Sequence, residues 1–189
     1  MSLHQKPAGL FVTLAVLLAS WGCGGRVDSG LPPALSVVED RVDFVLVVPT
    51  ELPRGTSAEP IVYAPDRASS ITYVFPAIED EGLPPESRAD VELIQTTDNI
   101  LGVRPSRPSD AVINVDGHTV TVLRNERPGE VLGITFVTPL PDSNVSVTTS
   151  WPSLQGGDHS ITDGMEEDAF KVLHSMLVQV PVTSDLSSS

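Results

Sequence analysis

Short stretches of alternating apolar and polar residues, separated by glycine and proline, run through most of this chain. In a β-strand such alternation places the apolar side chains on one face. The 17 prolines keep the stretches short and disfavour long helices. Residues 41–48 are apolar on both faces, which is typical of an interior strand. The pattern predicts strands over residues 41–48, 60–64, 70–75, 90–96, 111–115, 118–124, 130–138 and 144–151, with a last short strand over 179–183.

The clearest local structure is a hairpin over residues 111–124. Asp116 and Gly117 form a dipeptide that favours a two-residue type I′ turn, in which both residues have positive φ. With that turn, Val115 lies opposite His118, and the apolar residues of the two arms share one face. The turn chemistry and the hydrophobic register therefore predict the same hairpin.

One segment, residues 160–178, has helical rather than alternating spacing. Asp163 is a candidate N-cap, and Glu166 three residues later completes a pair that is similar to a capping box. The apolar residues at helical spacing are Met165, Ala169, Val172, Leu173 and Met176. We therefore expect one C-terminal helix near residues 163–177.

Eight or nine short strands with Gly/Pro turns predict an all-β fold, an antiparallel β-sandwich of immunoglobulin-like type with the C-terminal helix attached. We expect this domain to span residues 41–184, followed by a frayed tail over 185–189. Residues 119–139 carry Arg124-Asn125 ahead of Pro128-Gly129. This arrangement resembles the strand–turn–strand of PapD-like bacterial domains, and the resemblance implies architecture alone.

The N-terminus has a different pattern. An apolar run of 13 residues, 8–20, follows Lys6, and small residues surround Cys23. A membrane-spanning helix needs about 20 apolar residues, so the run is too short to span. A charged start, a short apolar stretch and small residues at its end are the parts of a cleavable secretion signal. We expect residues 1–22 to be the signal and the cut to fall between Gly22 and Cys23.

Residues 1–25 resemble the precursor of a bacterial lipoprotein. The family pattern has Leu, a small residue and Gly or Ala before the cysteine, where this chain has Ser20, Trp21 and Gly22. The resemblance implies that Cys23 becomes the lipid-bearing first residue, with residues 23–40 as the lipidated cysteine and a flexible tether. Several acyl chains hold a protein stably on its membrane. Plain secretion with a free thiol and an uncleaved anchor are the alternatives.

Charge and composition exclude several classes of function. The formal net charge of −14 repels the phosphates of nucleic acids, whose neutralisation by Lys and Arg dominates their affinity. It also gives anionic lipid headgroups no attraction for the body. The sequence contains no P-loop and no G-x-G-x-x-G, so we expect no nucleotide cofactor. Cys23 is the single cysteine, so the chain forms no internal disulfide.

The candidate ligand residues are two acidic clusters. Glu79, Asp80 and Glu81 lie on a predicted loop, where oxygen ligands bind calcium weakly or simply face solvent. The second cluster is Asp158, His159 and Asp163, for which helix capping by Asp163 is the competing explanation. No H-E-x-x-H or G-x-S-x-G motif is present, and we assign no catalytic residue.

The leading hypothesis is a non-enzymatic, lipid-anchored protein of the cell envelope that acts as a structural or protein-interaction module without a cofactor. Its expected partners are the membrane, through the lipid on Cys23, and an envelope protein. The alternative is a calcium-dependent binding or hydrolytic domain that uses the acidic loops.

Overall fold

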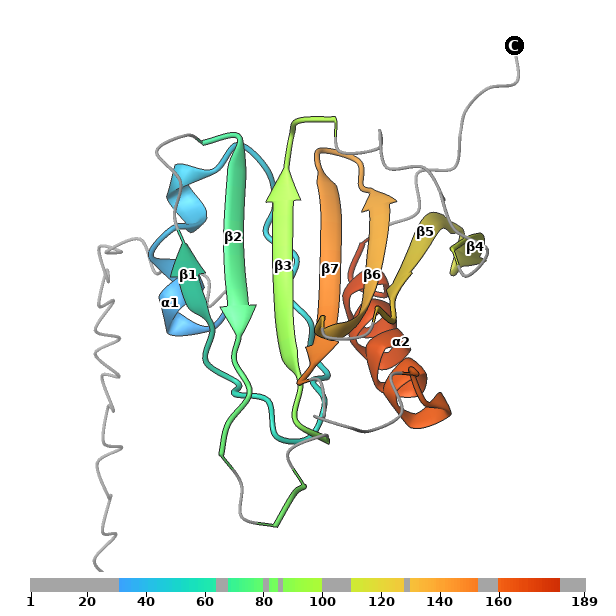
Figure 1. The fold of residues 1–189 in the computed structure, drawn as a ribbon. Coiled ribbons are helices and arrows are strands. Elements are labelled where there is room, and N and C mark those ends of the chain that lie inside the picture. The colour runs from blue at the N-terminus through green and yellow to red at the C-terminus, as the bar shows by residue number, and fades with distance from the viewer. Residues whose placement is uncertain are drawn as a thin grey trace, which may run out of the picture.

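A computed structural model of the chain describes residues 31–63, 68–79, 82–84, 87–99, 110–127, 130–152 and 160–180. Within these ranges seven strands form one antiparallel sheet in the order β1-β2-β3-β7-β6-β5-β4 (Figure 1). The strands are β1 (Ile61–Tyr63), β2 (Ser70–Phe75), β3 (Asp90–Thr96), β4 (Ala111–Val115), β5 (His118–Asn125), β6 (Leu132–Pro139) and β7 (Asn144–Trp151). The helices are α1 (Pro33–Ser36), the short 3₁₀ helix η1 (Glu39–Arg41) and α2 (Asp163–Leu177).

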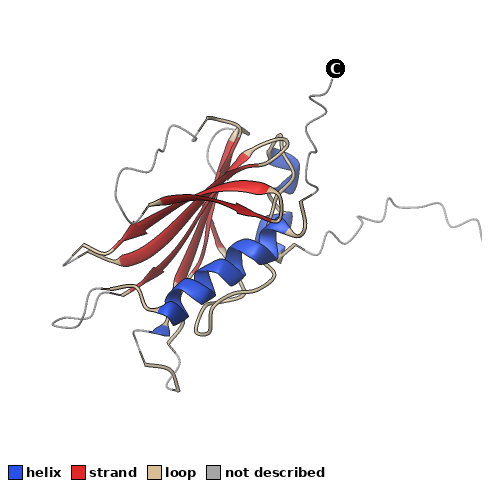
Figure 2. Cartoon of the chain, turned by 90° about the vertical axis from the view of Figure 1, so that its right-hand side faces the viewer, coloured by secondary structure: helices blue, strands red, loops and turns tan. Residues whose placement is uncertain are grey.

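The molecule has two layers. Helix α2 lies across one face of the sheet, and Figure 2 shows the layers from the side. The prediction of an antiparallel all-β fold with one C-terminal helix is confirmed. The described strands form a single sheet. The apolar face of a sheet must be buried against another element, and here the apolar side of α2 provides that second layer.

The predicted hairpin is present with the predicted register. Val115 pairs with His118 at the turn, and the ladder continues to Ala111 opposite Val122. Asp116 has φ of +51° and Gly117 has φ of +88°, as a type I′ turn requires. The predicted strand over 90–96 is also present, but the fold pairs it with β7 from much later in the chain.

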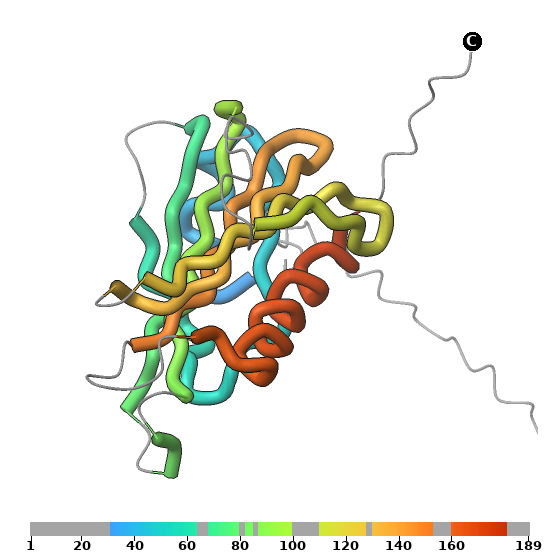
Figure 3. Tube along the Cα trace, turned by 45° about the vertical axis from the view of Figure 1, so that its right-hand side comes forward, coloured from blue at the N-terminus to red at the C-terminus, as the bar shows by residue number. Residues whose placement is uncertain are grey.

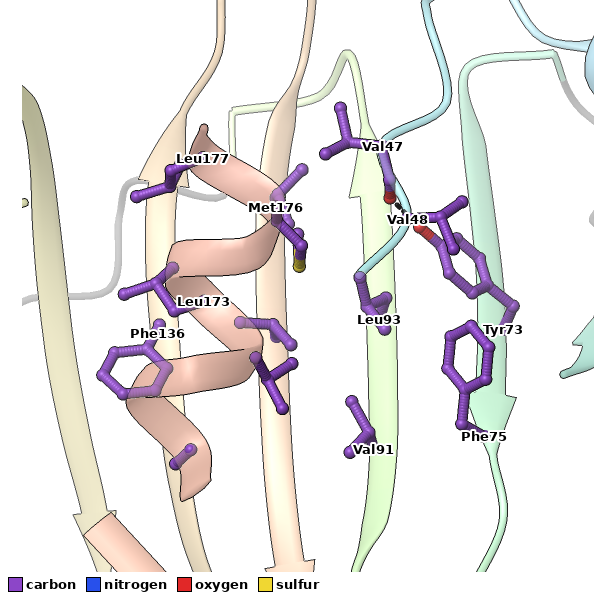
Figure 4. Close-up of a cluster of buried hydrophobic side chains, with 14 of the residues drawn as sticks. Val47, Val48, Tyr73, Phe75, Val91, Leu93, Phe136, Leu173, Met176 and Leu177 are labelled. Atoms are coloured by element: carbon purple, nitrogen blue, oxygen red, sulfur yellow. Dashed lines mark hydrogen bonds between the residues drawn. The ribbon is translucent and has the colours of Figure 1, made fainter. Parts of the chain in front are cut away.

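The core lies between the sheet and α2. Alternate residues of the central strands point into it, and Phe136 of β6 meets Phe170 of α2 with ring centroids 5.0 Å apart. Leu173 and Met176 are buried on the sheet-facing side of α2 (Figure 4). The largest fully buried side chains are Trp151, Tyr73, Phe75, Phe136, Leu35, Ile71, Leu93, Ile134, Leu173, Met176, Leu177 and Gln95.

The opposite face of the sheet carries mainly hydroxyl-bearing residues at its centre. Thr72, Ser146 and Thr121 lie on this face because their neighbours along each strand point into the core. The hydroxyls of Thr135 and Thr148 lie 2.9 Å apart on adjacent strands. One apolar and one polar face explain why the alternation along these strands was so regular.

Two predictions about the first described residues are wrong. Residues 31–40 are not an unpacked tether, because Leu35 and Val38 are buried in the core and α1 packs beside β1. Residues 41–48 do not form the predicted strand: Arg41 ends η1, residues 42–44 bend, and residues 45–48 pair with no described strand. Phe44, Leu46, Val47 and Val48 are buried as expected, whereas Val45 is exposed. The segment lies over the sheet and is bonded by side chains instead of a neighbouring strand.

Two predictions about the C-terminal helix also need correction. Thr162, not Asp163, is the N-cap of α2: its hydroxyl accepts a hydrogen bond from the N–H of Met165 (3.4 Å). Asp163 is the first helical residue, where its charge suits the helix dipole. Gln179 and Val180 form the turn that ends the helix and are not part of a strand, and residues 181–183 lie outside the described residues.

Candidate functional site

An apolar groove of about 340 Å³ opens where three distant parts of the chain meet. These parts are the extended 45–48 segment, the β6–β7 turn and the end of α2. The lining residues are Val45, Leu46, Val47, Leu140, Pro141, Asp142, Gln179 and Val180. Val45 is 72% exposed at this groove, although the segment around it is buried. One side of the groove is therefore exposed at Val45, and its other side rests on the buried residues Leu46 and Val47.

Gln95 holds the 45–48 segment against the sheet. Its side chain is fully buried on the core face of β3. Its Oε1 accepts a hydrogen bond from the N–H of Val47 (3.1 Å), and its Nε2 donates to the C=O of Val45 (2.7 Å). Nε2 also donates to Oγ of Ser143 (2.9 Å). One amide thus bonds the segment in the way that a neighbouring strand would, and all of its polar atoms are satisfied.

Other side chains complete this support. Oδ2 of Asp142 accepts from the N–H of Val45 (2.9 Å), and the Tyr73 hydroxyl donates to the C=O of Val47 (Figure 4). Further along, Oγ of Ser175 accepts from the N–H groups of Thr50 and Glu51, each at 3.2 Å. The segment is held by side chains from β2, β3, the β6–β7 turn and α2.

The outer edge of the 45–48 segment is unpaired at Leu46 among the described residues, although Leu46 as a whole is only 8% exposed. Successive residues of an extended chain direct their backbone groups to opposite edges. Because Val45 and Val47 bond toward the sheet, the groups of Leu46 point to the outer edge. Nε2 of Gln179 donates to the C=O of Val48 there (2.9 Å). Within the described part of the chain, no hydrogen bond reaches the N–H or C=O of Leu46.

The buried hydroxyl of Tyr73, which bonds the C=O of Val47, makes the stability of the protein depend on pH. Its burial raises the pKa of the hydroxyl well above the ordinary value. In the unfolded chain the same hydroxyl loses its proton near pH 10. Above that pH the native state binds more protons than the unfolded state, so the free energy of unfolding falls as pH rises, by up to about 1.4 kcal/mol per pH unit.

We therefore expect Tyr73→Phe to destabilise the protein more at neutral than at alkaline pH. At pH 7 the variant loses about 1–2 kcal/mol of unfolding free energy, because the C=O of Val47 loses its donor. Above pH 10 the difference in unfolding free energy between the two proteins becomes smaller. The wild type loses stability as Tyr73 ionises in its unfolded state, and the variant has no hydroxyl at this position. Urea unfolding at pH 7, 9, 10 and 11 measures this. Parallel curves for the two proteins would show that Tyr73 ionises as readily in the folded state.

Most of the predicted ligand residues lie outside the described residues: Asp80, Glu81, Asp158 and His159, together with the lipidation candidate Cys23. Glu79 is exposed beyond β2, and Asp163 is exposed at the start of α2. In the described ranges no three or more His, Cys, Asp or Glu side chains gather into a group able to hold a metal ion. The calcium site stays a prediction of the sequence.

The acids that follow Asp163 on α2 face basic partners. Glu166 forms an ion pair with Arg124 of β5, and Oε1 of Glu167 lies 2.8 Å from Nζ of Lys171. The hydrogen bond from Lys171 holds the pKa of Glu167 below its usual range. Nδ1 of His174 lies 2.7 Å from Oδ2 of Asp116, which ties the β4–β5 turn to α2 (Figure 3). The contacts of Glu166 and His174 join α2 to the sheet, whereas the Glu167–Lys171 pair lies within the helix.

Sequence reasoning missed the groove but carried one signal for it. Gln95 follows Val91 and Leu93 at the inward positions of β3, where a polar residue interrupts an apolar face. A buried amide must find hydrogen-bond partners, so its presence in that position indicates backbone to be bonded nearby. The identity of that backbone depends on the tertiary fold.

Comparisons with protein-family models, with curated proteins and with solved structures gave no match. Of the helices that the structure describes, none combines the length and hydrophobicity needed to span a bilayer.

Proposed function

We propose that this chain is a non-enzymatic, lipid-anchored protein of the cell envelope that binds an extended segment of a partner protein in the groove. The observation that carries the binding role is the open edge of the 45–48 segment at Leu46, directly beside the apolar lining. The anchor is supported by Cys23 and the apolar run before it. Secretion without lipid is the alternative for location.

The chemistry of the groove favours strand addition. An added strand gains affinity from main-chain hydrogen bonds and specificity from pockets that take alternate side chains. Leu46 offers one donor and one acceptor, and the groove beside it accepts an apolar side chain. Asp142 at the rim and the net charge of −14 favour a segment with basic flanking residues.

The binding role is tested with a fluorescent peptide, Lys-Val-Thr-Val-Thr-Lys, and a copy that is N-methylated at both valines and both threonines, so that each edge of the peptide loses its central N–H donors. We expect the first peptide to bind and the methylated copy to bind at least about tenfold more weakly, because it lacks the N–H donors that a ladder needs. Fluorescence polarisation measures both affinities. Equal affinity for the two peptides would rule out strand addition.

Matched variants locate the binding site. Val45→Glu places a charge in the groove at a side chain that is 72% exposed, so the fold is not at risk. Val112→Glu is the control, at a 57% exposed position on β4 at the far edge of the sheet. We expect Val45→Glu to abolish peptide binding and Val112→Glu to leave it unchanged. The reverse pattern would place the binding surface elsewhere.

The anchor is tested independently of the groove. We expect the wild-type protein to partition into detergent and to carry acyl chains on Cys23 by mass spectrometry, and Cys23→Ser to partition into water. A wild-type product that is cut before Cys23 but partitions into water would favour plain secretion.

A further inference from the structure

The β1 edge of the sheet exposes large apolar side chains. Val37, the C-cap of α1, is 63% exposed; Ile61 and Tyr63 of β1 are 50% and 57% exposed. Strand β1 is an end strand of the sheet, and α1 packs beside it (Figure 1). Because Val62 pairs with Tyr73, a core residue, Ile61 and Tyr63 point to the opposite face of the sheet. We call Ile61 and Tyr63 the β1 edge; Val37 lies on α1, which packs on the core through Leu35 and Val38, and is not counted with them.

The chain leading from Cys23 to this edge is short. Leu31 packs against the core, and α1 begins two residues later at Pro33. Seven residues, 24–30, separate Cys23 from Leu31. The eight Cα–Cα steps span at most about 28 Å when fully extended. An anchor on Cys23 therefore keeps the α1 side of the domain within that distance of the membrane surface.

We propose that the β1 edge lies against the headgroup region of the membrane that holds Cys23. This inference rests on the proposed lipidation. Tyrosine is enriched at membrane interfaces, where its ring is buried and its hydroxyl stays hydrated. Two apolar side chains bind a bilayer weakly alone, but the tether gives them a high effective concentration at its surface. Their contact orients a domain that the lipid already holds.

The negative charge of the protein determines which lipid headgroups the β1 edge can contact. Glu59 is exposed and precedes β1, so the edge has an acidic neighbour. The whole chain is also strongly acidic. Anionic headgroups would repel such a surface, whereas zwitterionic ones do not. The β1 edge therefore fits a zwitterionic lipid surface through apolar contact.

The orientation has a geometric consequence for the opposite edge. Strand β4 lies six strands away from β1 in the sheet. At a spacing of about 4.8 Å per strand, the two edges are roughly 29 Å apart. With the β1 edge on the lipid, the β4 end projects away from the membrane. Position 112 on β4 therefore serves as a control for position 63, because the two side chains are equally exposed at 57%.

The test uses the lipidated protein reconstituted into phosphatidylcholine vesicles. Because Cys23 is the single cysteine and its sulfur carries lipid, Tyr63→Cys and Val112→Cys each offer one free thiol for an environment-sensitive fluorophore. We expect headgroup-level nitroxide lipids to quench the probe at position 63 at least about twofold more than the probe at 112. Vesicle flotation and mass spectrometry of Cys23 accompany each measurement.

The outcomes separate this inference from the anchor. Protein that floats with the vesicles but shows equal quenching at the two positions, or more at 112, overturns the orientation and leaves the anchor intact. Protein that stays in solution with an unmodified Cys23 overturns the anchor and the orientation together. Quenching confined to position 63 on floating protein supports both.

Discussion

Gln95→Leu is expected to lower the free energy of unfolding by about 2–5 kcal/mol, although leucine fills nearly the same volume. The substitution removes the acceptor of the Val47 N–H and the donor to the Val45 C=O. The Val47 N–H then stays buried without a partner, and the partly buried C=O of Val45 loses its donor. A buried group without a partner costs about 1–3 kcal/mol. Urea unfolding followed by circular dichroism measures the loss.

Ser143→Ala is the matched control for this prediction. It removes one of the three hydrogen bonds of the Gln95 side chain and leaves the 45–48 segment bonded. We expect a loss of about 1 kcal/mol. If Gln95→Leu is no more destabilising than Ser143→Ala, the backbone of the 45–48 segment has found other partners, and Gln95 does not hold it.

Phe136→Ala is expected to lower the free energy of unfolding by about 3–5 kcal/mol. The side chain is fully buried between β6 and α2, where its ring meets Phe170. Its removal leaves a cavity at the contact between the two layers, in addition to the lost burial. The same unfolding measurement applies, with the midpoint temperature as a second reading.

The adjacent residue on β6 is the control for this prediction. Thr135 points to the opposite face, where its hydroxyl meets that of Thr148. We expect Thr135→Ala to cost about 1 kcal/mol or less. Similar losses for the two variants would contradict the assignment of a core face and an open face to β6.

The sequence predicted best those structures that are determined by neighbouring residues. The β4–β5 hairpin formed as expected because Asp116-Gly117 sets the turn and the register follows from it. Helix α2 was predicted from its own apolar spacing, but its first cap was shifted by one residue. Thr162 and Asp163 both accept hydrogen bonds well at a helix start, so composition alone does not choose between them.

Predictions failed where distant parts of the chain decide the structure. Residues 41–48 have the composition of an interior strand, but the buried amide of Gln95 takes the place of a neighbouring strand. Leu35 and Val38 lie in a stretch with too few apolar residues to predict packing, yet the core accepts both. The groove combines residues from three separate segments, so no single stretch of sequence contains it.

The place of β7 in the sheet has a consequence for when the protein folds. Among the described strands, β1–β3 and β4–β6 form two separate meanders, and β7 alone pairs with both, through β3 and β6. Until Trp151 has been made, each meander has an unpaired edge and lacks the helix that covers it. Pairing between segments so far apart in sequence is also slow. We therefore expect the sheet to close only after β7 and α2 have been made.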